Sequence, residues 1–376
     1  MMFDYEILRL IWWALLGVLL VAFAITDGFD MGVAALLPAV ARTDRQRRQV
    51  INTIGPVWEG NQVWFILGGG AIFAAWPALY AVSFSGFYLA MFLLLAALII
   101  RPVAFKFRSK REEPQWRARW DAALCFSGVV PALLFGVAVG NVLLGIPFHF
   151  DATLRPFYTG SFFDLLNPFA LLCGVVSLAM LVLHGATWLQ IKADGEPMER
   201  ARRYGMIAAV VVLVLFALGG LWLTQIDGYR IITEQDPFGP SNPLRKEVVA
   251  EAGYWLHNFN AHPWLWLVPM AGLAGAALAL LGLAGGRGAL SFIGSKLSVA
   301  AIITTVGVAM FPVILPSSIE PSHSLTVWDS SSSHYTLAVM LFSTALLLPI
   351  VLLYTAWVYK VLWGRVSEDD VKDDMY

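Results

Sequence analysis

The stretch Thr26-Asp27-Gly28-Phe29-Asp30-Met31-Gly32 sets two carboxylates inside a long apolar segment. The segment is long enough to cross a membrane. An aspartate near the bilayer centre costs about 2.5–3.5 kcal/mol, so such residues generally face a packed interior or a water path. At a spacing of three residues the two carboxylates share one helix face, and the two glycines let another helix approach closely. The stretch therefore predicts a membrane helix with a shielded polar face.

Composition predicts an integral membrane protein. Of the 376 residues, 59% are hydrophobic and 14% are charged, and the mean hydropathy is +0.70. A formal net charge of −1 gives no sign of nucleic-acid binding. The start of the chain carries Asp4 and Glu6 in place of a basic region, which predicts that the first helix is not a cleaved signal peptide. We expect one transmembrane domain over residues 1–376.

Windows of roughly 20 apolar residues predict an all-α polytopic fold with nine transmembrane helices. Eight of these helices would suit two four-helix bundles, with the ninth at the periphery. The predicted spans are residues 8–37, 58–76, 79–101, 118–145, 166–191, 203–226, 262–285, 289–315 and 333–361.

The basic residues predict the orientation of the chain. Of the 25 lysines and arginines, 20 fall in the connections after the first, third, fifth, seventh and ninth spans. Because such residues collect on the cytoplasmic side, the N-terminus is predicted outside and the C-terminus in the cytoplasm. Residues 227–261 would then form an extracytoplasmic loop, rich in turn-forming residues, with a short helix near residues 246–255.

Further acids lie toward the predicted cytoplasmic half. Glu59 belongs to Trp58-Glu59-Gly60-Asn61-Gln62-Val63-Trp64, and Asp121 follows Trp120. Each acid has two interpretations: it lies in the first turn of a helix, where the dipole favours a carboxylate, or it takes part in a proton or ion path. Asp27 and Asp30 are too far from a helix start for the first interpretation.

Histidines and cysteines argue against a catalytic or metal centre within this chain alone. Of six histidines only His184 lies well inside a predicted span, and haem iron needs axial ligands on facing helices. We therefore interpret His184 as a packed, hydrogen-bonded core residue. Cys125 and Cys173 are predicted at different depths and so not to form a disulfide. No P-loop, HExxH motif or cysteine cluster is present.

Several long motifs resemble subunit II of the cytochrome bd-type quinol oxidases, and the resemblance covers the whole chain. They lie at residues 11–13, 26–32, 58–64, 73–77, 84–88, 101–102, 109–110, 120–121, 140–141, 311–318, 324–329 and 353–357.

The resemblance implies a nine-helix subunit of the bacterial inner membrane, paired with a similarly folded subunit I that holds haem b and haem d. The complex would oxidise quinol near the outer face and reduce oxygen to water with cytoplasmic protons, building a proton gradient. Subunit II would support the haem subunit and line a proton path, and in some members an oxygen path. The family also includes members with a structural quinone and small single-helix accessory subunits, to which we assign no residues here.

Two roles carry over onto single positions. The acid of the 58–64 motif, proposed for proton entry, falls on Glu59, and the last tryptophan, proposed to flank an oxygen entrance, falls on Trp64. One position departs from the family pattern, because Lys106 stands where members carry an acid after the Arg-Pro pair. A proton route that uses this acid in other members would lack it here.

Two other classes of function fit the same residues. A proton-coupled secondary transporter would also place acids and glycine-interrupted helices inside the membrane. A purely structural scaffold subunit would use the acids only as hydrogen-bond partners. Substitution of Glu59 and Asp30 separates a scaffold from a proton path. A scaffold should lose assembly, whereas a proton path should lose turnover with the haem spectra of the complex intact.

Overall fold

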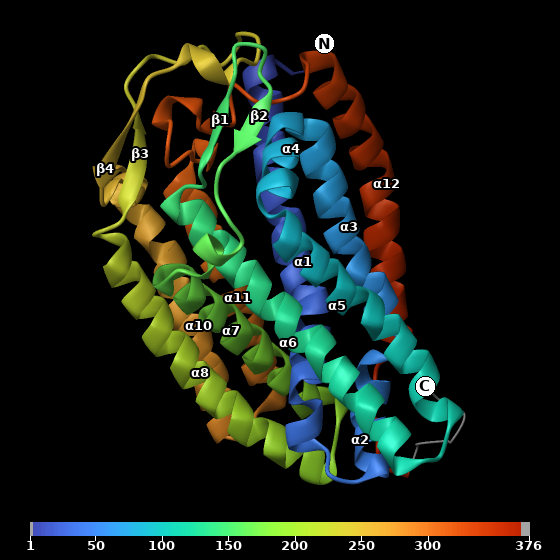
Figure 1. The fold of residues 1–376 in the computed structure, drawn as a ribbon. Helices are drawn as coiled ribbons and strands as arrows, with labels where there is room; N and C mark the ends of the chain where they lie inside the picture. The colour runs from blue at the N-terminus through green and yellow to red at the C-terminus, as the bar shows by residue number, and fades with distance from the viewer. Residues whose placement is uncertain (1–2, 370–376) are drawn as a thin grey trace.

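The computed structural model describes residues 3–369, and long helices form most of it (Figure 1). Within that range eight helices are long and apolar enough to cross a membrane singly, which agrees with the predicted all-α membrane fold. They are α1 (Tyr5–Val40), α5 (Tyr88–Phe107), α6 (Pro114–Leu144), α7 (Pro168–Lys192), α8 (Gly195–Leu223), α10 (Leu267–Ala284), α11 (Gly288–Met310) and α12 (His334–Val361).

A ninth candidate span is broken. Helices α3 (Trp58–Ala75) and α4 (Pro77–Gly86) meet at an angle of 120°. The break follows from Pro77, because a proline disfavours helical backbone in the residue before it, and Trp76 has ψ 75°. The predicted span 79–101 was therefore wrong at its start, since α4 is a separate short helix and α5 begins only at Tyr88.

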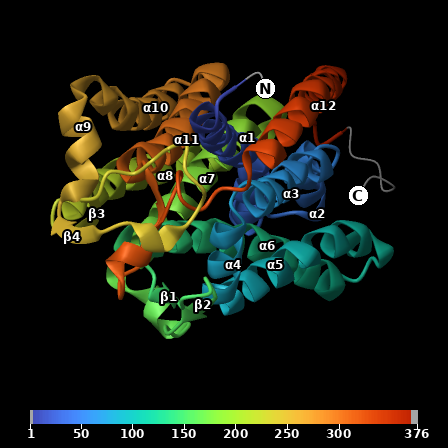
Figure 2. The ribbon, with the colours of Figure 1, turned by 90° about the horizontal axis from the view of Figure 1, so that it is seen from above.

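The long helices fall into two groups of four, and α1 and α6 of the first group pack against α7 of the second. Helices α1, α3, α5 and α6 make one group, in which α1 packs against α3 and α6. Helices α7, α8, α10 and α11 form a ring in which each helix contacts the next. Helix α12 lies at the rim, where it contacts α1 and α3 (Figure 2).

Glycines bring α1 against its neighbours. A Cβ atom on Gly32 would lie 1.9 Å from the carbonyl oxygen of Leu181 in α7, and one on Gly185 would lie 2.4 Å from the carbonyl carbon of Gly32. On another side, a Cβ on Gly128 of α6 would lie 2.4 Å from the Met31 oxygen. The predicted close approach is confirmed, and the approaching helices belong to this chain.

The basic connection after α1 contains a helix that the sequence analysis missed. Helix α2 (Asp44–Ile54) is capped at its N-terminus by Thr43, whose hydroxyl accepts a hydrogen bond from the backbone N–H of Gln46. Its apolar side chains Val50, Ile51 and Ile54 are buried in one core cluster with residues of α1 and α7. The connection therefore covers the predicted cytoplasmic end of the bundle.

The connection between α8 and α10 also differs from expectation. Strand β3 (Asp227–Ile231) pairs with antiparallel β4 (Val248–Ala252), so the helix predicted near residues 246–255 is wrong. Adjacent valines at 248 and 249 favour a strand, and Gly253 ends it with φ 74°. The remaining short elements are η1 (Arg108–Lys110), β1 (Phe148–Phe150), β2 (Pro156–Tyr158), η2 (Phe163–Leu166), η3 (Pro243–Arg245), η4 (Tyr254–Leu256), α9 (His257–Ala261), η5 (Pro263–Trp266), β5 (Val313–Leu315), η6 (Pro321–His323) and β6 (Leu325–Thr326).

Arg9 ties this connection to the first turns of α1. Its side chain is fully buried and donates hydrogen bonds to the Pro237 carbonyl (2.6 Å) and to the Ser331 hydroxyl (2.8 Å). The guanidinium also lies 3.6 Å from the centre of the Tyr5 ring. One cation thus joins three segments that are distant in sequence.

Candidate functional site

The polar face of α1 meets an arginine of α5. Arg101 donates a 2.6 Å hydrogen bond from Nη1 to Oδ1 of Asp27, with both side chains no more than 1% exposed. A second hydrogen bond, 3.3 Å long, joins Nη2 to the Ser127 carbonyl. Because a buried charge is tolerated only when it is paired, the ion pair explains how α1 carries Asp27 inside an apolar bundle.

The second acid of the face is held by polar side chains from α3 and α12. The Asn61 amide donates a 2.7 Å hydrogen bond from Nδ2 to Oδ2 of Asp30. The Tyr359 hydroxyl in turn donates a 2.6 Å hydrogen bond to Oδ1 of Asn61. The sequence prediction that Asp27 and Asp30 share a shielded face is confirmed.

Each of the two acids keeps one free oxygen. Oδ2 of Asp27 and Oδ1 of Asp30 are buried and have no hydrogen-bond partner within residues 3–369. Buried carboxylate oxygens are normally satisfied, so each of these atoms is a place for a water molecule or a proton. The cluster holds two acids and one guanidinium, and therefore has room for one extra proton before its charge is balanced.

Glu59 lies apart from this cluster. It is in the first turn of α3, where the helix dipole favours a carboxylate, and its side chain is exposed. Two residues later Asn61 points inward to Asp30. The start of α3 therefore presents one acid to the outside and one amide to the interior.

Asp121 belongs to a separate network near the inner end. It accepts hydrogen bonds from Arg47 (2.8 Å) and from Arg108 (2.5 Å). The interpretation that it starts a helix is wrong, since α6 begins at Pro114, seven residues earlier. Arg108 and Arg117 also bind Asp44, so the network fastens α2 to η1 and α6.

Asp44 lies outside the membrane-spanning segments. Its burial opposes ionisation, but the positive charge of Arg108 and the hydrogen bonds from Arg108 and Arg48 outweigh that effect and hold the pKa of Asp44 below its usual value. The network therefore depends on an ionised Asp44.

Trp64 is buried in the apolar cluster that contains Phe23, Leu94 and Leu98. Lys106, the departure from the family pattern, lies in the last turn of α5 with its side chain exposed. Neither residue contributes to the cluster of acids around Arg101.

His184 is a packed and hydrogen-bonded core residue, as predicted. One ring nitrogen, Nδ1, lies 2.8 Å from the Ser295 hydroxyl, and Nε2 lies 2.9 Å from the Ile25 carbonyl oxygen. Both nitrogens are thus occupied, and the site does not fit an axial haem ligand. Cys125 and Cys173 are free thiols, as expected.

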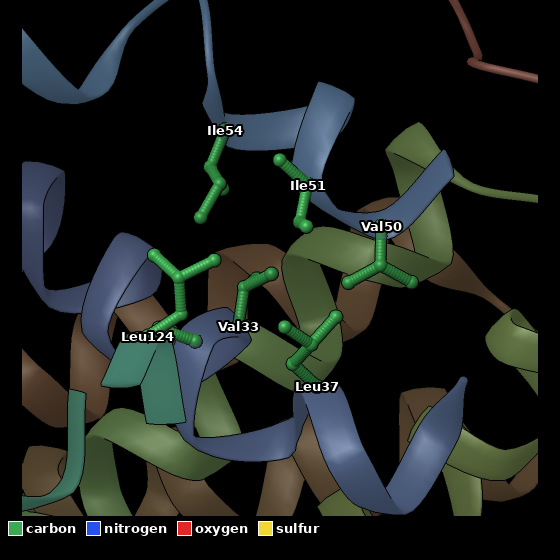
Figure 3. Close-up of a pocket in the computed structure, with 7 residues that line it drawn as sticks. Val33, Leu37, Val50, Ile51, Ile54 and Leu124 are labelled. Carbon is green, nitrogen blue, oxygen red and sulfur yellow. The ribbon is translucent and has the colours of Figure 1, made fainter. Parts of the chain in front are cut away.

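One small cavity lies between α1, α2 and α6 (Figure 3). Its volume is about 10 Å³ and its lining is wholly apolar, with Val33, Leu37 and Val50 among the lining residues. A water molecule needs on the order of 10–15 Å³ and several polar partners, so this cavity is dry and forms no site.

Three residues of the site were missed from the sequence. Arg101 ends an unbroken apolar run and was counted among the loop cations, whereas α5 continues to Phe107 and buries it. Asn61 stands inside a motif in which the sequence analysis singled out only Glu59 and Trp64. Tyr359 lies on the last span, and nothing in the sequence ties it to α3.

Comparisons with known proteins agree with this architecture. Residues 8–362 match the family described as cytochrome bd terminal oxidase subunit II. The chain is 52% identical to cytochrome bd-I ubiquinol oxidase subunit 2 of Escherichia coli K12 over 372 residues, which cover 99% of this chain and 98% of that protein. It is 30% identical to cytochrome bd ubiquinol oxidase subunit 2 of Bacillus subtilis over 364 residues, covering 96% of this chain and 97% of that protein.

The fold agrees with a solved oxidase. A chain in the structure of bd oxidase from Geobacillus thermodenitrificans superposes with a TM-score of 0.69 at 16% identity, covering 95% of this chain and 99% of that chain. The match over residues 8–362 and the near full-length identities show that this membrane chain belongs to the cytochrome bd terminal oxidase subunit II family.

Proposed function

We propose that this chain is the non-haem subunit of a bacterial inner-membrane oxidase that oxidises quinol and reduces oxygen to water. The relatives from E. coli and B. subtilis are named as subunits of ubiquinol oxidases. In this proposal subunit I holds haem b and haem d, which carry the electrons and bind oxygen. The present chain stabilises that subunit and delivers protons from the cytoplasm.

The observation that carries the proton role is the cluster of Asp27, Asp30 and Arg101 in the bundle interior. Acids inside a membrane protein commonly belong to proton relays. Arg101 balances the charge of Asp27, which leaves the second carboxylate as the group that takes up and releases the proton, at its free Oδ1. Arg101 and Asn61 act as positioning residues, because each holds one carboxylate oxygen and leaves the other open.

Glu59 is the proposed collecting group at the inner surface. It starts a strip of exposed residues on α3 that continues through the apolar side chains of Val63, Ile66 and Phe73, which are 42–68% exposed. An acid at the head of an apolar strip fits a surface that a partner subunit covers. We assign Asp121 to the structural network with Arg47 and Arg108, and keep Trp64 with its apolar surroundings as the proposal for oxygen passage.

Substitution of Asp30 by asparagine tests the proton role. Asp30→Asn keeps the size of the side chain and its acceptance from Asn61 but removes the titratable group. Quinol-driven oxygen consumption of the assembled complex should fall by about tenfold or more, which corresponds to about 1.4 kcal/mol in the barrier. Haem spectra and subunit assembly should stay normal. Normal turnover would refute the role, and loss of assembly would favour a scaffold.

A further inference from the structure

A second and much larger cavity lies at the end of the bundle where α2, the end of α7 and the end of α12 meet. Its volume is about 260 Å³, and Asn52, Thr53, Val57, Trp188, Tyr359 and Arg365 are among its lining residues. A water molecule needs on the order of 10–15 Å³ of such space, so a group of waters fits. The basic loops predict that this end faces the cytoplasm.

The wall of this cavity contains a polar group without a protein partner. Asn52 is 8% exposed, and neither its side-chain oxygen nor its side-chain nitrogen has a hydrogen-bond partner among residues 3–369. A buried amide without partners costs about 1–3 kcal/mol, and water in the cavity would remove that cost. The apolar cavity of Figure 3, on the other side of α2, contains no such group.

Lys192 lines the cavity and binds the segment of chain that follows α12. Its ammonium donates hydrogen bonds to the carbonyl oxygens of Leu362 (2.6 Å) and Gly364 (2.8 Å). These bonds hold the segment that carries Arg365, an exposed residue that lines the cavity. The cavity therefore has one wall held by hydrogen bonds and a charged, exposed residue in its lining.

Tyr359 connects this cavity to the buried acids. It lines the cavity, and its hydroxyl is hydrogen-bonded to Asn61, which is hydrogen-bonded to Asp30. Only two side chains thus separate the cavity from the proposed proton carrier. Glu59 is absent from the cavity lining and lies on the exposed face of α3, so this approach to Asp30 is distinct from the one through Glu59.

We propose that the cavity is a water-filled antechamber through which protons reach Asp30, with Tyr359 and Asn61 as its inner barrier. This inference rests on the proposed proton role of Asp30. The Asn61 amide is too weak an acid and too weak a base to relay a proton, so in this proposal the Tyr359 hydroxyl leaves Asn61 and water then approaches Asp30. A hydronium ion then gives its proton to Oδ1 of Asp30 and remains as water, and no other bond forms or breaks.

Cysteine accessibility tests the antechamber in the assembled oxidase. The parent complex carries Cys125→Ala and Cys173→Ala, and Val57→Cys then places one thiol in the wall of the large cavity. The matched control, Val50→Cys, places the same thiol in the small apolar cavity. Thr53→Cys is a second variant in the large cavity should Val57→Cys assemble poorly. The probe is a negatively charged, membrane-impermeant methanethiosulfonate, applied to inside-out and to right-side-out vesicles.

Labelling of Val57→Cys is expected in inside-out vesicles only, and the bound sulfonate should then slow oxygen consumption by about fivefold or more. The Val50→Cys control should stay unlabelled and fully active. An unlabelled Val57→Cys, whether the cavity is dry or filled by an amphiphile, would overturn the inference. A labelled Val57→Cys with unchanged turnover would overturn it as well.

The Asp30→Asn variant separates this inference from the function on which it rests. If Asp30→Asn slows turnover but labelling of the Val57→Cys complex leaves turnover unchanged, the antechamber proposal is refuted and the proton role of Asp30 stands. If Asp30→Asn keeps full turnover, both fail, whatever the labelling shows.

Discussion

The guanidinium of Arg101 and the carboxylate of Asp27 are 2.6 Å apart in the centre of the first helix group, and neither side chain reaches solvent. Removing one partner from such a pair leaves an unpaired buried charge. Arg101→Gln should therefore destabilise the complex by about 3–5 kcal/mol. The double variant Asp27→Asn/Arg101→Gln should recover most of that loss, because it removes both charges. Thermal unfolding of the purified complex measures both. Equal stability of the single variant and the parent would contradict the pairing.

Glu59 offers a test of proton collection at the inner surface. Glu59→Gln keeps the helix start but removes the titratable group, so oxygen consumption should fall by about tenfold, or about 1.4 kcal/mol in the barrier. Glu59→Asp should keep more activity. Glu112→Gln, an exposed acid of the connection between α5 and α6, is the control and should have no effect. A fully active Glu59→Gln complex would leave Glu59 only its place at the helix dipole.

Gly32 tests the contact between α1 and α7. Gly32→Ala would place a Cβ 1.9 Å from the Leu181 oxygen, so the helices must separate. We expect a loss of about 1–3 kcal/mol, seen as a lower melting temperature of the complex. Gly17→Ala is the matched control in the same helix, since nothing lies within 4 Å of its added Cβ, and alanine favours a helix. Equal effects of the two substitutions would argue against the close approach.

The contact between His323 and β1 predicts that the stability of the loops at the predicted outer end of the protein depends on pH. Burial lowers the pKa of His323, and the neighbouring His149 and Lys246 act in the same direction while Glu320 opposes them. Its Nδ1 accepts a 3.1 Å hydrogen bond from the Phe150 amide, which requires the neutral ring at that nitrogen. The unfolded chain therefore binds the proton first as the pH falls.

The stabilisation from His323 is complete above the usual histidine pKa of about 6.5 and is lost as the pH falls below it toward the lowered value. The protection of the Phe150 amide against hydrogen exchange, taken relative to its intrinsic exchange rate at each pH, should fall between about pH 7 and pH 5. His323→Asn, which can still accept the hydrogen bond but does not titrate, should keep that protection constant. Constant protection in the parent protein across this pH range would refute the assignment.

The orientation of the chain is open to a direct test. Reporter fusions after Arg48, Arg111 and Arg203 should read cytoplasmic, because these residues belong to the connections predicted to lie in the cytoplasm. Fusions near Pro240 and Ser331 should read exterior. A cytoplasmic signal at Pro240 would reverse the assignment of the loop between α8 and α10.

Some of this architecture could be predicted from the sequence because it depends on local composition. The apolar runs locate most helices, and the three-residue spacing of Asp27 and Asp30 places both on one face. Arg101 could not be placed, because a hydropathy window ends at the first charge and cannot show that a distant carboxylate neutralises it. The pairing of β3 with β4 was missed for the same reason, since the partner strand lies about twenty residues away along the chain.

The same limit applies to the site. The acids can be recognised in the sequence because they are charged residues in an apolar stretch. The roles of Asn61 and Tyr359 depend on a contact between residues that are 298 positions apart in the chain. The cavity beside Tyr359 is formed by three helices that meet only in the folded bundle. Properties of this kind come from packing, and no single segment encodes them.

Arg9 bears on how the protein is made. The residue is among the first to be synthesised, yet its partners at Pro237 and Ser331 come 228 and 322 residues later. During translation Arg9 therefore lacks both partners until the loop at Pro237 has been made, and its set of partners is complete only when nearly the whole polypeptide has left the ribosome. The bond to Ser331 can form only when α12 is being inserted. The first turns of α1 are thus among the last parts of the protein to acquire all their contacts, and a product truncated before Pro237 would lack both of these partners.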